Sequence, residues 1–343
     1  MMVRSFAAAV TAAGLLFLTA ATPAGAGAVD AVFVFGDSLS DTGNLAEIQG
    51  ANFPNPPFFN DRVTNGQVAV DYLSEKFGLG PERPSLFVNG FQDTHNLFGP
   101  GFQFGTNYAI AGARAFQPGN GDLTDQVNGF LARPGGGGVA DPNALYTVFI
   151  GGNDVRTAAH SNNASLITSA VNAVKANIQT LINKGAVHIL VPNVGNVGGI
   201  PEFTQQSPAG QAALATADSI LYNQLLATAI AQLRAANPTV ELTLFDFFAF
   251  STDVANNAAA LGITNTTDPC LKGNFTPNAN CFDAQTNTIL FSKFLFWDAI
   301  HPTAQVQQAW GQGLIEAVPE PATLLVLGAG LLGMATIRRR AAA

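Results

Sequence analysis

Three side chains near opposite ends of the chain have the types needed for nucleophilic catalysis: Ser38, Asp298 and His301. A serine hydroxyl is a weak nucleophile and needs a neighbouring base to take its proton. The spacing of three residues lets Asp298 bind the Nδ1–H of His301 across one turn, which leaves Nε2 facing the serine. Pro302 stops regular structure directly after His301 and would hold this turn rigid. We therefore expect Ser38 to be the nucleophile, His301 the general base and acid, and Asp298 the group that orients the imidazole.

The nucleophile must be presented by an element, and the residues before it supply one. Residues Val32–Phe35 are four large apolar residues in a row, which is typical of a parallel strand buried on both faces. Gly36 ends this strand and places Ser38 just past its carboxyl end, where open α/β sheets hold their ligands. In an extended chain Asp37 points away from Ser38, so we expect a structural, hydrogen-bonding role for its carboxyl.

Two further predicted strands end in residues that suit an oxyanion hole. Residues Thr106–Ile110 are followed by Gly112, and residues Leu145–Ile150 by Asn153. In a right-handed, doubly wound sheet such strand ends open onto one edge and can meet Ser38 there. A glycine lets the backbone approach an oxyanion without a side chain in the way, and an asparagine supplies a neutral N–H donor. The adjacent Asp154 is interpreted as structural.

The remaining chain alternates apolar strand patterns with helical ones. Helical spacing of apolar residues predicts helices over Val68–Phe77, Leu123–Leu131, Ser165–Lys184 and Ala209–Ala236, and further strands are predicted over Val187–Val191 and Val240–Phe245. Five strands alternating with helices predict one α/β domain with a five-stranded parallel sheet. The aromatic run Leu244–Phe250 is interpreted as core strand and not as a cofactor site.

Four sequence blocks occur in the order of a known family. They are the strand ending in Gly36-Asp37-Ser38, NYAIAGA at 107–113, FIGGND at 149–154 and WDAIHPT at 297–303. Together they resemble the SGNH hydrolases, also called the GDSL esterase/lipase family, over about residues 31–314. The resemblance implies a flavodoxin-like three-layer α/β/α sandwich and hydrolysis of carboxylic esters through an acyl-enzyme. It implies the same triad of Ser38, His301 and Asp298, and an oxyanion hole built from the backbone N–H groups of Ser38 and Gly112 with the side chain of Asn153.

Other chemistries have less support. The Gly-x-Ser-x-Gly motif of α/β-hydrolases is absent, because Ser40 occupies the second glycine position. His95, His160 and His188 have no second ligand at metal spacing, so we expect no metal site. The Gly135–Gly138 run lacks the lysine and helix of a phosphate-binding loop, and we expect no cofactor. A net charge of −8 argues against nucleic-acid binding.

The two ends of the chain predict export. Residues 1–28 have one arginine, a short apolar run and small residues in an A-x-A pattern, which predicts a cleaved secretory signal; a retained membrane anchor is the alternative. An exported chain is exposed to oxidising conditions, so we expect its only two cysteines, Cys270 and Cys281, to form a disulfide. The hydrolase domain is then expected over residues 29–316.

Residues 317–343 contain Val318-Pro319-Glu320-Pro321, an apolar stretch just long enough to span a bilayer, and three arginines. This tail resembles the PEP-CTERM sorting signal of Gram-negative bacteria. The resemblance implies transient membrane insertion, recognition by an exosortase, and delivery to the cell envelope or extracellular matrix. A buried core helix is the alternative for the same stretch.

The sequence leaves the substrate and the final acceptor open. The proline- and phenylalanine-rich segment 41–65 could line an acyl pocket, or could be a lid or a loop packed on the core. Phenylalanine-rich loops favour lipid or aryl esters, whereas the sorting signal favours acetylated glycans. Acyl transfer to an alcohol would use the same residues as hydrolysis. An inactive surface binding protein of the same fold is the alternative from another class.

Overall fold

A four-stranded parallel sheet lies at the centre of the molecule. The computed structural model describes residues 29–85, 105–117, 121–133 and 136–318. The strands β1 (Val32–Gly36), β2 (Leu145–Phe149), β3 (His188–Pro192) and β4 (Glu241–Phe245) pair in parallel in the order β1-β2-β3-β4. Every residue of β1 and β2 is buried, as expected for strands covered on both faces. The predicted α/β class and four of the predicted strands are confirmed.

The prediction of a fifth strand at Thr106–Ile110 is wrong. This segment lies beside β1, and the amides of Tyr108 and Ile110 donate to the carbonyls of Val34 and Gly36. Side chains interrupt its outer edge, however. The Asn44 Nδ2 donates to the carbonyls of Asn107 and Ala109, and the Ala109 amide donates to Asn107 Oδ1. Because asparagine side chains compete for backbone groups, only isolated bridges form here and no regular strand.

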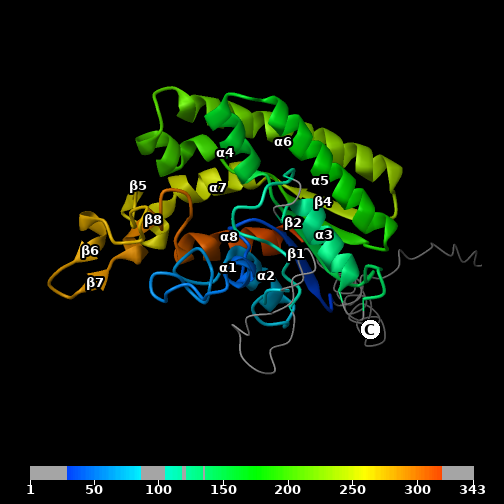
Figure 1. Ribbon diagram of the computed structural model, residues 1–343, viewed down its shortest axis with the longest axis horizontal. Coiled ribbons are helices and arrows are strands. Elements are labelled where there is room, and N and C mark those ends of the chain that lie inside the picture. The colour runs from blue at the N-terminus through cyan, green and yellow to red at the C-terminus, as the bar shows by residue number, and fades with distance from the viewer. Residues whose placement is uncertain (1–28, 86–104, 118–120, 134–135, 319–343) are drawn as a thin grey trace, which may run out of the picture. The chain divides into compact units, whose positions relative to one another are not determined.

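Helices cover both faces of the sheet (Figure 1). They are α1 (Asn44–Gln49), α2 (Ala69–Lys76), α3 (Leu123–Ala132), α4 (Gly152–Ser161), α5 (Ser165–Asn183), α6 (Gln211–Ala236), α7 (Phe247–Asn256) and α8 (Ala304–Ala317). On one face Phe33, Tyr146 and Ile189 pack in a core with α3, α4, α5 and α6. On the other face Val34 and Leu190 pack with α2 and α8. The predicted three-layer arrangement is therefore present.

The helix α5 forms where the spacing of apolar residues predicts it. Its buried face repeats every three or four residues, at Ile167, Ala170, Val171, Val174, Ile178 and Leu181. This stripe matches the 3.6-residue period of an α-helix and packs against the sheet core. In contrast, the run Leu244–Phe250 is not one strand as predicted. The strand β4 ends at Phe245, and the Asp246 side chain accepts from the Ala249 amide and so starts α7.

Smaller elements follow the sheet and carry the disulfide. The strand β5 (Asn265–Pro269) pairs with β8 (Phe294–Phe296), and β6 (Phe282–Asp283) pairs with β7 (Thr288–Ile289). Short helical turns are η1 (Val197–Gly199), η2 (Glu202–Gln206), η3 (Ala258–Leu261), η4 (Ala279–Cys281) and η5 (Phe291–Lys293). The predicted disulfide between Cys270 and Cys281 is present and buried.

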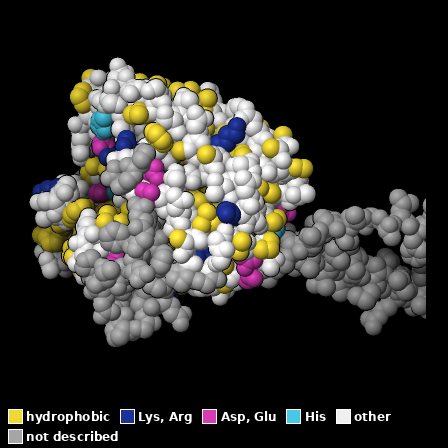
Figure 2. Space-filling model, turned by 45° about the vertical axis from the view of Figure 1, so that its right-hand side comes forward, with side chains coloured by type: hydrophobic (Ala, Val, Ile, Leu, Met, Phe, Trp, Pro, Cys, Tyr) yellow, Lys and Arg dark blue, Asp and Glu magenta, His cyan; other side chains and the backbone are white. Residues whose placement is uncertain are grey.

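One face of the described part carries few charged side chains (Figure 2). Charged residues make up 11% of the whole chain, and on the face shown Lys, Arg, Asp and Glu are scattered among apolar and other atoms. Within the described ranges, no helix combines the length and apolar character needed to cross a bilayer. The predicted signal peptide at 1–28 and nearly all of the predicted sorting segment, residues 319–343, lie outside the described residues.

Candidate active site

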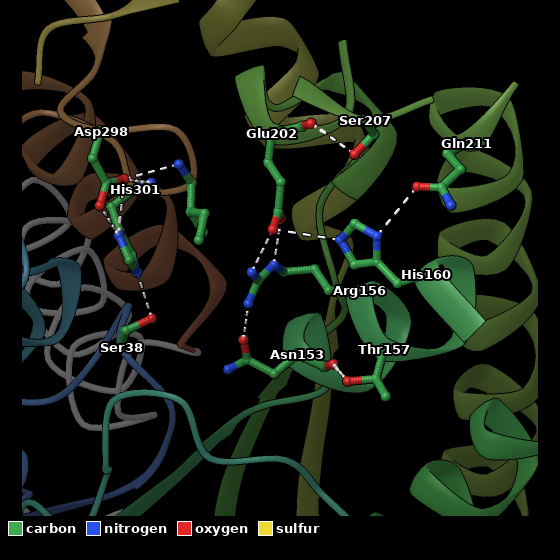
Figure 3. A network of polar contacts seen from close by, with 11 residues as sticks. Ser38, Asn153, Arg156, Thr157, His160, Glu202, Ser207, Gln211, Asp298 and His301 are labelled. Atoms are coloured by element: carbon green, nitrogen blue, oxygen red, sulfur yellow. Dashed lines mark hydrogen bonds and ion pairs between the residues drawn. The ribbon is translucent and has the colours of Figure 1, made fainter. Parts of the chain in front are cut away.

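The structure brings Ser38, His301 and Asp298 into a hydrogen-bonded chain (Figure 3). The His301 Nε2 lies 2.8 Å from Ser38 Oγ, and its Nδ1 lies 2.9 Å from Asp298 Oδ2 and 3.0 Å from Oδ1. All three residues are buried. A carboxylate on Nδ1 fixes the tautomer in which Nε2 can accept the proton of the serine hydroxyl. The arrangement can therefore generate a serine nucleophile.

The loop between β8 and α8 holds the acid and the base in place. The Asp298 Oδ1 accepts from the amides of Ile300 and His301, at 2.8 and 2.7 Å, and the Trp297 amide donates to the His301 carbonyl. The Thr303 hydroxyl closes the loop by donating to the Phe294 carbonyl. Because one carboxylate satisfies the backbone and the imidazole together, the orientation of His301 is fixed by the loop itself.

The pKa of Asp298 is lowered despite its burial. Burial in a low dielectric acts to raise the pKa of this carboxyl, but the charge and hydrogen bonds of His301, with the two backbone amides, outweigh it. Asp298 consequently stays ionised and can stabilise an imidazolium on His301 during reaction.

The turn after β1 is held by two buried carboxyls. The Asp37 Oδ1 accepts from the Leu39 amide, the structural role predicted for it, while burial raises the pKa of Asp37 to about 6. The Asp41 carboxylate accepts from the amides of Gly43 and Ala111. Asp41 therefore ties the turn that carries Ser38 to the loop that carries Gly112.

Asp154 ties the same loop to α4. Its carboxylate accepts from the amides of Ala115 and Phe116, and burial raises its pKa to about 7. Gly151 precedes this helix with a φ of 122°, and a Cβ there would overlap the ring of Tyr222. Only glycine fits this close approach, which brings Asn153 to the sheet edge.

Each of the three predicted oxyanion donors has an N–H hydrogen that bonds to no acceptor among the described residues. Gly112 has a φ of 84° with open space where a side chain would stand. Within the described residues, the amides of Ser38 and Gly112 donate to no protein acceptor. The Asn153 Nδ2 uses one hydrogen on the Ala113 carbonyl at 2.9 Å, which leaves its second hydrogen.

A polar network next to Asn153 was not predicted from the sequence. The Arg156 Nη1 donates to Asn153 Oδ1 at 2.8 Å, and its Nε and Nη2 form a bidentate pair with Glu202, both at 2.7 Å (Figure 3). His160 lies 3.4 Å from the same carboxylate. The spacing of Asn153 and Arg156 on one helix face was a usable signal. Glu202 lies 46 positions after Arg156, and no sequence pattern indicated that the two would pair.

A cavity of about 240 Å³ opens beside Ser38. Ser38 and Asn153 line it, and further walls come from the loop after β3, from α7, and from β8 and α8. The apolar lining residues are Leu39, Phe149, Ile150, Val194, Val197, Ile200, Phe247, Ala255, Leu295, Phe296, Ile300, Pro302 and Trp310.

The aromatic residues of segment 41–65 do not line this cavity. Phe53 and Phe58 pack with Trp297 and the disulfide in a separate cluster. Of the alternatives left open for this segment, the structure shows core packing for these two side chains.

His160 and His188, the other histidines that the structure describes, have protein partners. His188 pairs with Glu241 at 2.8 Å, and His160 contacts Gln211 besides Glu202. His95 lies outside the described residues. Among the residues that the structure describes, no group of three or more potential ligands could hold a metal ion.

Two family models match this chain, one over its body and one over its C-terminal segment. Residues 32–314 match the model of the GDSL-like lipase/acylhydrolase family, and residues 317–340 match the PEP-CTERM protein-sorting motif. The chain is 28% identical to a GDSL esterase/lipase of Arabidopsis thaliana over 312 residues, covering 80% of this chain and 82% of that protein. It is 31% identical to Lipase 1 of Photorhabdus luminescens over 210 residues, 60% of this chain but 28% of the length of that relative.

Among solved structures, an acetyl-xylooligosaccharide esterase from Geobacillus is similar with a TM-score of 0.42 and 12% identity, over 85% of this chain and 95% of that chain. A lipase from a goat rumen metagenome is similar with a TM-score of 0.40 and 14% identity, over 83% of this chain and 96% of that one.

Proposed function

Because the chain belongs to the GDSL-like lipase/acylhydrolase family, a family of carboxylic ester hydrolases, we propose that it hydrolyses esters through an acyl-enzyme formed on Ser38. The single observation that carries the proposal is the 2.8 Å contact between Ser38 Oγ and His301 Nε2, with Asp298 on the opposite ring nitrogen. This is the geometry that an activated serine needs.

The first half of the reaction transfers the acyl group to the enzyme. The Ser38 Oγ attacks the ester carbonyl carbon while its proton passes to His301 Nε2. The tetrahedral oxyanion accepts hydrogen bonds from the backbone N–H groups of Ser38 and Gly112 and from Asn153 Nδ2. Collapse of this intermediate breaks the bond to the alcohol oxygen, which takes the proton from His301 and leaves.

The second half regenerates the serine. Water gives a proton to His301 Nε2 and attacks the acyl carbonyl, and the same three donors hold the second oxyanion. Collapse breaks the bond to Ser38 Oγ, which receives the proton from His301, and the carboxylic acid leaves. Replacing the water with an alcohol would give acyl transfer from the same residues.

Hydrolysis of p-nitrophenyl esters by the wild type and by Ser38→Ala tests the proposal. We expect Ser38→Ala to abolish the burst of p-nitrophenol and to lower kcat by at least a thousandfold. Asn153→Ala should lower kcat by about a hundredfold to a thousandfold. Equal residual rates in the wild type and in Ser38→Ala would overturn the enzymatic proposal and favour a binding protein.

The sorting motif supports a destination for this enzyme. It suggests export and anchoring at the cell surface, and implies processing by an exosortase. We further propose that both terminal segments are removed and that the body reaches the envelope or extracellular matrix of a Gram-negative bacterium. Fractionation of cells that express the chain with and without residues 319–343 tests this. An unchanged distribution would contradict it.

A further inference from the structure

The cavity beside Ser38 presents a largely apolar interior. The buried apolar side chains of Val194, Val197, Phe247 and Leu295 line it. The few hydroxyl and amide groups in the lining are mostly occupied elsewhere. The hydroxyls of Ser251 and Thr252 both donate to the Phe248 carbonyl, and the Asn196 side chain accepts from Thr216. A ligand there gains more from burying apolar surface than from hydrogen bonds.

The lining shows how an ester can enter the cavity. The alcohol oxygen must take its proton from His301, so the alcohol part leaves from the imidazole. Ser38 and Asn153 line the cavity, and so do Ile300 and Pro302 on either side of His301, whereas the imidazole itself does not. An acyl chain bonded to Ser38 can therefore extend into the cavity while the alcohol oxygen stays at the imidazole.

We propose that this cavity binds an unbranched acyl chain and makes the enzyme selective for esters of longer acids over acetyl esters. The cavity of about 240 Å³ is larger than an acetyl group needs, and its lining is largely apolar. Burying such a chain gives roughly 0.8 kcal/mol per methylene. This inference rests on the proposed function of Ser38.

The test places a larger side chain on α7, where it narrows the cavity. Ala255 lines the cavity, whereas Ala249 on the same helix is exposed and does not line it. We expect kcat/KM of the wild type to rise at least tenfold from p-nitrophenyl acetate to octanoate. Ala255→Phe should lower the octanoate value at least tenfold and the acetate value less than threefold. Ala249→Phe should follow the wild type for all esters.

A second substitution and a binding assay distinguish failure of this inference from misfolding of the variant and from failure of the proposed function. If Ala255→Phe does not fold, Thr252→Trp at the exposed rim should produce the same selective loss. Titration of octanoate into Ser38→Ala by calorimetry should show binding that Ala255→Phe removes, whether or not the enzyme turns over. A wild type that prefers acetate, or an Ala255→Phe loss equal for all chain lengths, would overturn the inference. A selective loss on octyl acetate but not on methyl octanoate would also overturn it.

A second inference comes from the polar network beside Asn153. A carboxamide can point its oxygen or its nitrogen towards the oxyanion, and only the nitrogen can donate. Arg156 carries donors alone, so its bond to Asn153 Oδ1 turns the oxygen away and leaves Nδ2 for Ala113 and the oxyanion.

Glu202 fixes the guanidinium in turn. The bidentate pair holds Arg156, and burial, which alone would raise the pKa of Glu202, is outweighed by the hydrogen bonds and charge of Arg156, so the pKa is lowered. The Glu202 amide donates at 2.9 Å to the carbonyl of Ala299, in the loop that holds Asp298 and His301. The ion pair therefore joins the oxyanion donor to the loop of the base.

We infer that Arg156 and Glu202 are positioning residues that keep the Asn153 donor aimed at the oxyanion. Arg156→Met should lower kcat about tenfold with KM within twofold, and Arg156→Lys should restore part of kcat. In an Asn153→Ala background, Arg156→Met should change kcat less than twofold, because the donor it positions is gone. Lys175→Met, which removes only the hydrogen bond from a half-buried lysine of α5 to Gln232, should change neither constant. Equal losses in both backgrounds would overturn the inference.

Discussion

At the scale of single residues, the carboxylate at 298 sets the tautomer of the base. Asp298→Asn keeps an oxygen for the amides of Ile300 and His301 but places an N–H donor against the imidazole. His301 then carries its proton on Nε2 and cannot accept the Ser38 proton. We expect kcat to fall by about 10³ to 10⁴ with the fold intact. Steady-state kinetics and circular dichroism check this, with Asp246→Asn at the start of α7 as the control. A loss below tenfold would contradict the role of Asp298.

Gly112 offers a prediction that separates backbone strain from catalysis. Gly112 and Gly78 have φ values of 84° and 76°, and neither has an atom within 4 Å of an added Cβ. Alanine at either position should cost about 1–2 kcal/mol of unfolding free energy, because L-residues disfavour this conformation. Only Gly112→Ala should also lower kcat, by displacing an oxyanion donor. Chemical denaturation with p-nitrophenyl ester kinetics checks both, and an equal effect of the two substitutions on kcat would count against Gly112.

The sequence predicted the side chains of the hydrogen-bonded chain better than the residues that support them. Ser38 could be found because a strand pattern ends just before it, and His301 because an aspartate precedes it by three residues. Glu202 escaped notice because its pairing with Arg156 spans 46 positions, and no local pattern encodes such a contact. Asp41 was missed for the same reason, since its bond to Ala111 spans 70 positions.

At the scale of elements, the disulfide supports the strand that leads to the triad loop. The Cys270 amide donates to the Phe296 carbonyl, and the Leu271 amide donates to the Trp297 carbonyl, directly before Asp298. Cys270→Ser with Cys281→Ser should lower the unfolding free energy by roughly 2.5 to 3 kcal/mol, from the entropy of the short closed loop. Calorimetry of the double variant checks this. An unchanged Tm would show that the loop is held by its backbone pairing alone.

Elements with an unbroken apolar pattern were predicted well. Elements in which side chains bond to the backbone groups were not. The strands β1 to β4 follow from their apolar runs, and α5 from its stripe. The segment at Thr106–Ile110 was also predicted as a strand, but the side chains of Asn44 and Asn107 bond to its edge groups. The aromatic run after β4 changes to helix because Asp246 caps it, a local signal that hydrophobicity alone hid.

At the scale of the whole molecule, buried carboxyls give stability a pH dependence. Glu82 is buried beside Thr106 and the Arg62–Asp71 pair, and burial raises its pKa from 4.5 to about 8. Between these values the folded state binds more protons than the unfolded state, so this group makes stability fall as pH rises from about 4.5 towards 8. Asp37 and Asp154 act in the same direction.

Glu82→Gln should remove the contribution of this carboxyl to the fall of stability with rising pH. Near pH 5 the neutral acid and the amide are similar, so the two Tm values should agree, whereas at pH 8 the variant should melt higher. Scanning calorimetry from pH 5 to 8 measures the difference, and Glu75→Gln, an exposed carboxylate, should follow the wild type. A Tm difference that does not change with pH would contradict the raised pKa of Glu82.

The cavity is the feature that only the whole fold shows. Its walls come from segments between positions 37 and 310, and each contributes residues that also suit an ordinary core. The phenylalanines of segment 41–65 gave a stronger local signal, yet Phe53 and Phe58 pack elsewhere. Composition therefore indicated an apolar pocket without indicating its place.

Ser38 and His301 stand 263 positions apart, one after the first strand and the other before the last described helix. No stretch of chain that lacks either end can bring these two side chains into contact. During synthesis, the proposed reactive pair consequently cannot form until almost the whole hydrolase body has been made and folded. The wide separation acts as a built-in delay between the start of synthesis and the first possible turnover.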